Sequence, residues 1–322
     1  MPTVTVVIPT YNRAEVLPRA VDSVLAQSYE DFELLVVDDG STDRTAAALA
    51  AYDDPRLRVV THGDNRGANA ARNTGIAEAS GEYVAFLDSD DSWAPEKLER
   101  QLDRLLAAGD DAVAVYCDFE LDVPGGSGRL RSAAASVLAR FDDDVPAEGG
   151  EELAAEILAD RLHSGAGSTL LVETAVARRI DGFDERLDRF QDPEFLLRVV
   201  QKGRLCYVDE PLVTRHDTGS PAPETIERSD SYLLSKHRSL VEDLAAEGYA
   251  IESAHALVVA KEYLQVGEVP DGLRHLSRAD VPARHWPGVL WSLAVGVRRR
   301  SPRRAVAAAL LVVGLAALLA RR

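Results

Sequence analysis

Short apolar runs alternate with segments of helical periodicity over the first 120 residues. Residues 4–9 form the first apolar run, and the next segment places a set of apolar side chains on one face of a helix. This set is Leu17, Ala20, Val21, Val24 and Leu25. Further strands are predicted at residues 32–37, 57–61 and 83–87. Strands that alternate with helices predict an α/β fold, in which crossover helices flank a Rossmann-like mixed sheet.

The pattern changes twice further along the chain. Strand and helix patterns return at about residues 151–215, whereas beyond residue 221 only helices are predicted, at about 225–247 and 253–266. We therefore expect three parts: an α/β domain over residues 1–220, a helical extension over residues 221–283, and an apolar, Arg-flanked, membrane-associating segment over residues 284–322.

The C-terminal segment has the composition of a membrane-associating sequence. Residues 286–297 are apolar and aromatic, residues 298–304 include five arginines, and residues 305–320 are uninterruptedly apolar. A helix of that last length spans about 24 Å at ~1.5 Å per residue, less than the ~30 Å hydrocarbon core. A thin span, an interfacial or hairpin anchor, and a helix buried against the rest of the protein all fit. The N-terminus lacks a signal-peptide pattern, so we expect the folded part at the cytoplasmic face of the cell membrane.

Charge and cysteine content narrow the possible partners. The 322 residues carry a formal net charge of −17, which disfavours nucleic-acid binding because that affinity depends largely on Lys and Arg at phosphates. Such acidity with few lysines is typical of a halophilic protein, since high salt screens repulsion between surface carboxylates. The two cysteines, Cys117 and Cys206, show neither disulfide nor zinc spacing, which fits a reducing compartment.

Acidic and small residues follow several predicted strands, where open α/β sheets bind ligands. No GxGxxG motif follows the first strand, which argues against a dinucleotide site. Asp39 lies at a strand end within VVDDGSTD and suits either a hydrogen bond from a nucleobase imide or a turn and helix cap. Arg72 lies in GANAARNTGI among small residues, where it would face a base or phosphate or form a buried structural pair.

The most informative motif is GEYVAFLDSDD, at residues 81–91. An apolar strand ends there in Asp88, Ser89, Asp90 and Asp91. Three carboxylates this close repel one another, and a hard cation such as Mg²⁺ or Mn²⁺, bridging to substrate phosphates, would relieve the repulsion. The alternative is a solvated acidic turn, but charge at the end of a buried strand needs a partner.

These motifs, together with VVIPTYNR at residues 6–13, resemble the family 2 glycosyltransferases of the GT-A fold over roughly residues 4–220. The resemblance implies that Thr10 and Tyr11 line the base pocket and that Asp39 and Arg72 contact the base. It further implies that Asp88 touches the ribose and that Asp90 binds a metal, Mn²⁺ or Mg²⁺, which bridges the diphosphate.

The second half of the domain resembles the acceptor half of that family. Its motifs are GAGSTLLV, with Ser168 as a candidate substrate-binding residue, and GFDERLDRFQDPEFLLRV. Asp192 occupies the position of the catalytic base, and Gln191 replaces the usual glutamate before it. A helix cap before Pro193 is the structural alternative for Asp192, and Glu194 is the fallback base.

His216, in VTRHDTGS, resembles a histidine that some members use as a metal or diphosphate ligand; the alternative is a structural role. The implied activity is inverting transfer of a sugar from a nucleotide-diphosphate sugar to a hydroxyl or lipid-phosphate acceptor, in envelope glycan, glycoprotein or glycolipid synthesis. A non-catalytic sugar-nucleotide-binding module is the alternative. A nucleotidyltransferase is disfavoured because no Gly-rich basic loop follows the first strand.

Overall fold

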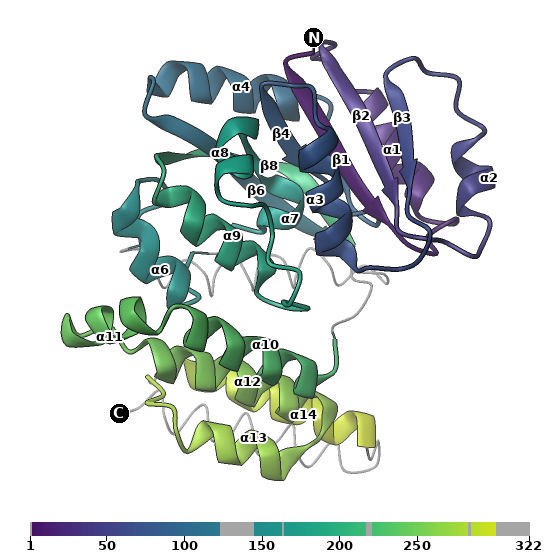
Figure 1. Cartoon of the computed structure of the whole chain (residues 1–322). Helices are drawn as coiled ribbons and strands as arrows, with labels where there is room; N and C mark the ends of the chain where they lie inside the picture. The colour runs from purple at the N-terminus through teal and green to yellow at the C-terminus, as the bar shows by residue number, and fades with distance from the viewer. Residues whose placement is uncertain (1, 123–144, 163, 217–220, 283–284, 301–322) are drawn as a thin grey trace. The chain divides into compact units, whose positions relative to one another are not determined.

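The computed structural model describes residues 2–122, 145–162, 164–216, 221–282 and 285–300 (Figure 1). The chain forms two compact units. The first comprises Met1–Ile157, Arg161–Arg186 and Gln191–Gly219, and the second comprises Leu158–Asp160, Leu187–Phe190 and Ser220–Arg322.

The first unit contains a mixed sheet of eight strands in the order β3-β2-β1-β4-β7-β6-β8-β5. The strands are β1 Val4–Thr10, β2 Phe32–Asp38, β3 Leu57–Thr61, β4 Tyr83–Phe86, β5 Ser92–Trp93, β6 Ala112–Asp122, β7 Leu171–Glu173 and β8 Arg204–His216. The pairs β1–β2, β1–β4, β2–β3 and β6–β8 are parallel, whereas β4–β7, β6–β7 and β5–β8 are antiparallel. The predicted α/β fold with a mixed sheet is confirmed.

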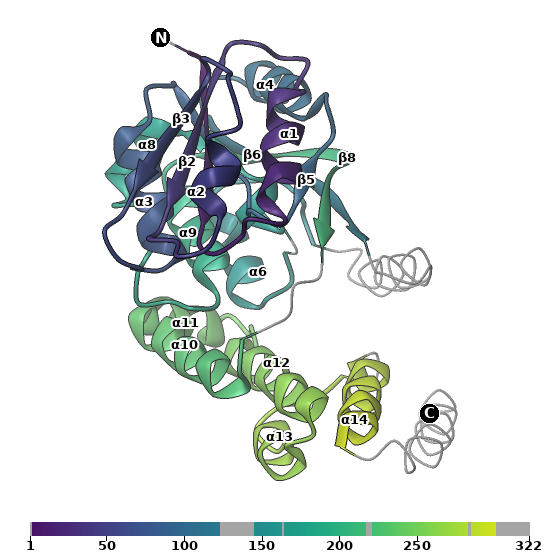
Figure 2. The ribbon, with the colours of Figure 1, turned by 90° about the vertical axis from the view of Figure 1, so that its right-hand side faces the viewer.

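Alternate residues of β1 face different helices. Val4, Val6 and Ile8 belong to the main core cluster, together with residues of α1 and α4. On the other face, a Cβ built on Gly75 of α3 would lie 2.3 Å from a methyl carbon of Val7, so only glycine fits there. Figures 1 and 2 show α1 and α3 on opposite sides of the strands.

The remaining helices of the first unit connect strands or follow them. The helices are α1 Leu17–Leu25, α2 Thr45–Leu49, α3 Ala68–Glu78, α4 Lys97–Ala108, a 3₁₀ turn at Glu151–Leu153, α6 Ala154–Leu158, α7 Ala166–Thr169, α8 Thr174–Arg179 and α9 Gln191–Val200. Asp43 accepts hydrogen bonds from both the backbone N–H and the hydroxyl of Thr45, the first residue of α2.

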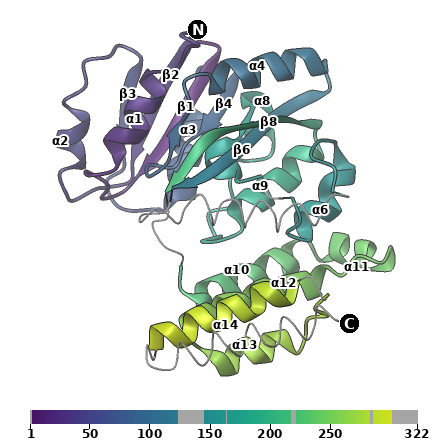
Figure 3. The same ribbon diagram turned by 180° about the vertical axis from the view of Figure 1, so that it is seen from behind.

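The second unit is helical, as predicted. Its helices are α10 Pro223–Lys236, α11 Arg238–Ala246, α12 Ile251–Val266, α13 Val269–Leu276 and α14 Trp286–Arg300. The helix expected at 225–247 is divided at His237, which separates α10 from α11. In Figure 3, α12 and α14 lie side by side, and Val289 of α14 packs in one cluster with Leu257 and Leu264 of α12.

Within the described residues, no helix is long and apolar enough to cross a membrane. The apolar run at 305–320 lies outside the described residues.

Candidate active site

The acidic turn after β4 is held by partners from distant parts of the chain. The guanidinium of Arg72 lies 2.6 Å from Asp88 Oδ1, and the backbone N–H of Asp91 donates to the carbonyl of Asp88. Asp91 accepts hydrogen bonds from the Ser168 hydroxyl at 2.6 Å and from the His216 backbone N–H at 3.1 Å. The solvated acidic turn is therefore ruled out for Asp88 and Asp91.

Burial and mutual repulsion act on these carboxylates. Burial, reinforced by the charge of Asp88, raises the pKa of Asp91 to about 6, although the hydrogen bond from Ser168 opposes the shift. Burial also raises the pKa of Asp88, and the charges of Asp192 and Asp90 add to this against the opposing effect of Arg72. The site thus concentrates negative charge where it is costly without a cation.

The carboxylate of Asp192 lies next to that of Asp88 in the acidic turn. It sits in the first turn of α9, inside a helix that begins at Gln191, so it is not a cap before that helix. A Cβ built on Gly167 of α7 would lie 2.9 Å from Asp192 Oδ2 and 3.0 Å from Asp88 Oδ2. Asp192 Oδ1 is buried and has no hydrogen-bond partner among the described residues.

The fallback base does not have a free carboxylate. Glu194 is fully buried and accepts two hydrogen bonds from Arg198, at 2.9 and 2.6 Å. A carboxylate held in this way is unsuited to take a proton from an incoming hydroxyl. Of the two candidates, only Asp192 has an unpartnered oxygen.

A pocket of about 360 Å³ lies beside these carboxylates. Among the residues that line it are Thr10, Tyr11, Asp39, Arg72, Asp88 and Asp90. The Thr10 hydroxyl is buried without a hydrogen-bond partner in the described structure, while Tyr11 is 42% exposed at the rim. The structure thus brings six of the sequence-predicted residues to one concave surface.

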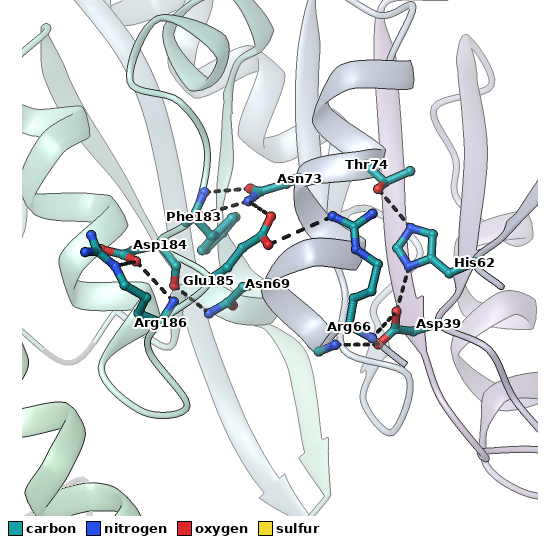
Figure 4. Close-up of polar contacts among 11 residues, drawn as sticks. Asp39, His62, Arg66, Asn69, Asn73, Thr74, Phe183, Asp184, Glu185 and Arg186 are labelled. Carbon is teal, nitrogen blue, oxygen red and sulfur yellow. Dashed lines mark hydrogen bonds and ion pairs between the residues drawn. The ribbon is translucent and has the colours of Figure 1, made fainter. Parts of the chain in front are cut away.

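Asp39 lines this pocket, but its carboxylate is already used within the chain (Figure 4). It accepts hydrogen bonds from the backbone N–H groups of Arg66 and Gly67, and His62 Nδ1 lies 2.6 Å from its Oδ1. His62 Nε2 in turn lies 2.9 Å from the Thr74 hydroxyl. Asp39 therefore orders the loop before α3 instead of capping α2.

Arg72 forms the buried pair that was one of its two predicted roles. It is 3% exposed, pairs with Asp88 and lies over the Phe183 ring at 5.3 Å. Ser168 is 1% exposed, and its hydroxyl donates to Asp91 and accepts from the backbone N–H of Asp88. Ser168 thus supports the acidic turn from behind and presents no hydroxyl to a substrate.

His216 reaches the acidic turn from the end of β8. Its Nδ1 lies 3.1 Å from Asp122 Oδ2, while its Nε2 is buried without a hydrogen-bond partner among the described residues. Burial, together with the charge of Arg19, lowers the pKa of His216, which favours the neutral imidazole that metals bind. Asp90 is also close enough to affect that pKa.

Asp90 and His216 are the candidate ligands of a divalent cation near the acidic turn. No group of three or more His, Cys, Asp or Glu side chains is arranged to hold a metal in the part of the chain that the structure describes. Asp90 and the unpartnered His216 Nε2 would supply protein ligands, and substrate phosphates and waters would complete the oxygen-rich shell that Mg²⁺ and Mn²⁺ take.

Two organising residues escaped the sequence analysis. Asn12 has φ +53°, and its side-chain oxygen accepts hydrogen bonds from the backbone N–H groups of Thr42 and Asp43. Asparagine after a strand was the available signal, because asparagine tolerates left-handed backbone. His62 gave no such signal, since its partners Asp39 and Thr74 lie on other elements.

The sequence matches known proteins over about one third to two thirds of its length. Residues 5–145 match the family model described as glycosyl transferase family 2. The succinoglycan biosynthesis protein ExoO of Rhizobium meliloti is 45% identical over 142 residues, which are 44% of this chain and 40% of that protein. An uncharacterized glycosyltransferase of Rickettsia typhi is 31% identical over 212 residues, 66% of this chain and 63% of that protein.

A third relative carries a specific name. It is the UDP-Glc:alpha-D-GlcNAc-diphosphoundecaprenol beta-1,3-glucosyltransferase WfgD of Escherichia coli, 42% identical over 103 residues, 32% of this chain and 41% of that protein. This chain thus spans about two fifths to two thirds of the length of these relatives.

Solved structures share the fold at low sequence identity. A mannosyltransferase from Pyrobaculum calidifontis, in complex with GDP-Man and Mn²⁺, aligns with TM-score 0.58 and 22% identity over 94% of this chain and 88% of its own. S. aureus TarS, residues 1–349 with UDP-GlcNAc, aligns with TM-score 0.54 and 20% identity over 95% of this chain and 83% of its own. The matched sequence and this shared architecture agree with the acidic turn and pocket described above: residues 5–145 match glycosyl transferase family 2, and the fold of the chain is that of the GT-A glycosyltransferases.

Proposed function

We propose that this chain transfers a sugar, with inversion, from a nucleotide-diphosphate sugar to a hydroxyl or lipid-phosphate acceptor, with the help of a divalent cation. One observation carries the proposal. Asp192 has a buried carboxylate oxygen without a hydrogen-bond partner among the described residues. Its other oxygen and an oxygen of Asp88 both lie within 3.0 Å of the position that a Cβ on Gly167 would take, and Asp88 lines the pocket. A buried carboxylate without a partner is costly, so it is retained for a chemical task.

The pocket beside the acidic turn would receive the donor. Thr10 offers the base an unpartnered hydroxyl and Tyr11 an exposed ring, while Asp88 and Asp90 line the same pocket and would face the ribose and diphosphate. Since Asp39 already accepts hydrogen bonds from the loop before α3, its contact with a base would use a remaining lone pair. Arg72 would set the orientation of Asp88 toward the ribose.

Asp192 would act on the acceptor. Its carboxylate removes the proton from the acceptor hydroxyl while that oxygen bonds to the anomeric carbon, and the bond from this carbon to the diphosphate oxygen breaks. Attack opposite the leaving group inverts the anomeric centre. When bound by Asp90 and His216, Mn²⁺ or Mg²⁺ supplies charge stabilisation to the departing diphosphate.

Similar proteins support the donor and acceptor classes. The TarS structure contains UDP-GlcNAc and the mannosyltransferase structure contains GDP-Man and Mn²⁺, so both neighbours bind nucleotide-diphosphate sugars. The name of the E. coli relative describes a diphosphoundecaprenol-linked acceptor. We infer from these a lipid-linked acceptor and a role in envelope glycan synthesis.

A lipid-linked acceptor agrees with a location at the membrane. Helix α14 exposes 59% of Trp291 and continues into Arg298 and Arg299, which is the combination of aromatic and basic groups favoured at lipid headgroups. We propose that the C-terminal segment binds the cytoplasmic face of the cell membrane.

Incubation of the purified chain with a panel of nucleotide sugars, Mn²⁺ and lipid-linked acceptors tests the proposal. Release of nucleoside diphosphate that depends on acceptor and metal is the expected result. A donor that binds without any release would instead favour the sugar-nucleotide-binding module.

A further inference from the structure

The segment Gly182–Arg186 is attached to α3 by side-chain amides (Figure 4). Asn73 makes a reciprocal pair with Phe183: the Phe183 N–H donates to Asn73 Oδ1 at 2.7 Å, and Asn73 Nδ2 donates to the Phe183 carbonyl at 2.9 Å. The same Nδ2 donates to Glu185 Oε1 at 3.1 Å. The side chain of Asn73 thus makes the pair of hydrogen bonds that a neighbouring strand would otherwise make with the backbone of Phe183.

Only glycine fits beside this pair. Gly182 has φ +63°, and a Cβ built on it would lie 2.3 Å from Asn73 Oδ1. A positive φ and a close approach both exclude larger residues. The amide of Asn73 and the backbone at Gly182 are therefore fitted to each other.

Phe183, which Asn73 holds, also packs against α9, the helix that carries Asp192. The Phe183 ring stacks on the Phe195 ring of α9, with centroids 4.1 Å apart and an angle of 8° between the planes. Phe195 lies three residues after Asp192 on the same short helix. A shift of Phe183 would therefore shift α9 and the carboxylate in its first turn.

The contacts of residues 182–186 also extend, through α3, to the pocket that would receive the donor. Asn69, one turn before Asn73, donates to the Asp184 carbonyl at 3.1 Å and accepts from Arg72 at 3.0 Å. Arg72 holds Asp88, as described above. The guanidinium of Arg66, in the loop before α3 that Asp39 orders, lies 4.0 Å from a carboxylate oxygen of Glu185 (Figure 4).

We propose that Asn73 is a positioning residue that holds α9, and with it Asp192, at the correct distance from Asp88. The inference rests on the proposed transfer reaction, because only then do the two carboxylates have to be placed relative to each other. Asn73 is not among the residues that line the pocket. Its effect passes through Phe183 and Phe195 on one side and through the shared helix α3 on the other.

Asn73→Ala removes all three hydrogen bonds and tests the proposal. Displacement of a catalytic group by about 1 Å costs about 10²-fold in rate, so we expect turnover to fall by about that factor. Affinity for nucleoside diphosphate with Mn²⁺, measured by calorimetry, should stay unchanged because the pocket is left intact. Glu78→Ala, on the same helix as Asn73, is the matched control, since it breaks an exposed ion pair with Arg58 of β3 and should leave turnover unchanged.

A rescue experiment separates positioning from a general loss of structure. Asn73→Asp keeps an acceptor for the Phe183 N–H but places a second carboxylate against Glu185, so it should lose turnover like Asn73→Ala. Asn73→Asp also faces the Phe183 carbonyl with an acceptor, so adding Glu185→Gln relieves only the repulsion at Glu185 and should recover part of the turnover. Wild-type turnover in Asn73→Ala or in Asn73→Asp would overturn the proposal.

Hydrogen exchange gives a readout that does not require activity. In the full chain, the Phe183 amide should exchange faster in Asn73→Ala, while the amides of β1 stay protected. An unchanged Phe183 amide contradicts the attachment itself. A wild-type chain that turns over no donor contradicts the proposed function, whereas normal turnover in both chains contradicts only the role of Asn73.

Discussion

Asp88 and Asp192, 104 positions apart in the sequence, converge on the Cα of Gly167: a Cβ placed there would come within 3.0 Å of an oxygen of each. One carboxylate follows a central strand and the other begins α9. Burial raises the pKa of Asp88, and the charge of Asp192 adds to this shift. The absence of a side chain at Gly167 leaves room for both carboxylates.

Gly167→Ala should therefore abolish most turnover. The added methyl group would press on both carboxylate groups, and a displacement of about 1 Å is enough to lower the rate about 10²-fold. Release of nucleoside diphosphate at saturating donor measures the effect. Gly63→Ala is the matched control, because a Cβ there meets nothing within 4 Å. Equal turnover in the two variants would show that the space at Gly167 is unimportant.

Asp192→Asn should lower turnover by about 10²–10⁴-fold, the usual cost of losing a general base. Asparagine keeps the size of the side chain, so donor affinity and unfolding midpoint should stay near those of the wild type. Single-turnover kinetics and calorimetry check both expectations. If Asp192→Asn remains active, another group takes the proton.

Glu194→Gln should lower stability and leave turnover unchanged, the opposite of the result expected for Asp192→Asn. It weakens a buried pair with Arg198, and hydrogen bonds to charged groups contribute about 1.5–3 kcal/mol, so the free energy of unfolding should fall. Turnover per folded molecule should remain. Urea unfolding followed by tryptophan fluorescence separates the two effects, and a loss of turnover without a loss of stability would return the role of base to Glu194.

The sequence predicted the parts of the fold and site that depend on local pattern. Apolar runs predicted β1 to β4, and the cluster after β4 indicated a charged site, because both signals lie within a few neighbouring residues. Contacts between distant segments left no such signal. The hydrogen bond from Ser168 to Asp91 joins residues 77 positions apart, so Ser168 was predicted at the substrate although it lies behind the acidic turn.

Asp90→Ala should remove metal-dependent donor binding. Asp90 lines the pocket and influences His216, so its loss takes away one of two proposed protein ligands. Calorimetry with nucleoside diphosphate, with and without Mn²⁺, should show an effect of metal in the wild type and none in the variant. Asp103→Ala, an exposed carboxylate on α4, is the control. A metal effect that persists in Asp90→Ala would exclude Asp90 as a ligand.

Removal of residues 301–322 should weaken the binding of the chain to membranes while preserving donor binding. The cut must fall after α14, because Val289 and Leu290 are buried and Val289 packs with Leu257 and Leu264 of α12. Flotation with anionic vesicles, at low and high salt, compares the two chains. If the full chain stays unbound under both conditions, the C-terminal segment does not bind membrane.

Lys97 gives a prediction about pH and stability. This side chain is fully buried in α4, hydrogen-bonds to Gln101 Oε1 at 2.6 Å and lies 3.8 Å from the centre of the Trp93 ring. Burial lowers its pKa from 10.5 to about 8. The unfolded chain therefore binds more protons than the folded chain between these two values, and the free energy of unfolding due to Lys97 rises with pH in that window.

Lys97→Met should remove this dependence. Methionine fills a similar volume without a charge, so the cost of burying the ammonium, present in full below pH 8, disappears in the variant. A shift of about 2.5 pKa units corresponds to about 3 kcal/mol between neutral pH and pH 10.5. The difference in unfolding free energy between variant and wild type should therefore shrink by about this amount across the window, even though the variant also loses the contacts with Gln101 and Trp93. Urea titrations at several pH values measure this difference in unfolding free energy, with Lys202→Met, which replaces an exposed lysine, as the control.

A difference that is constant with pH would mean that Lys97 stays protonated inside the core, stabilised by the Trp93 ring and the Gln101 amide oxygen.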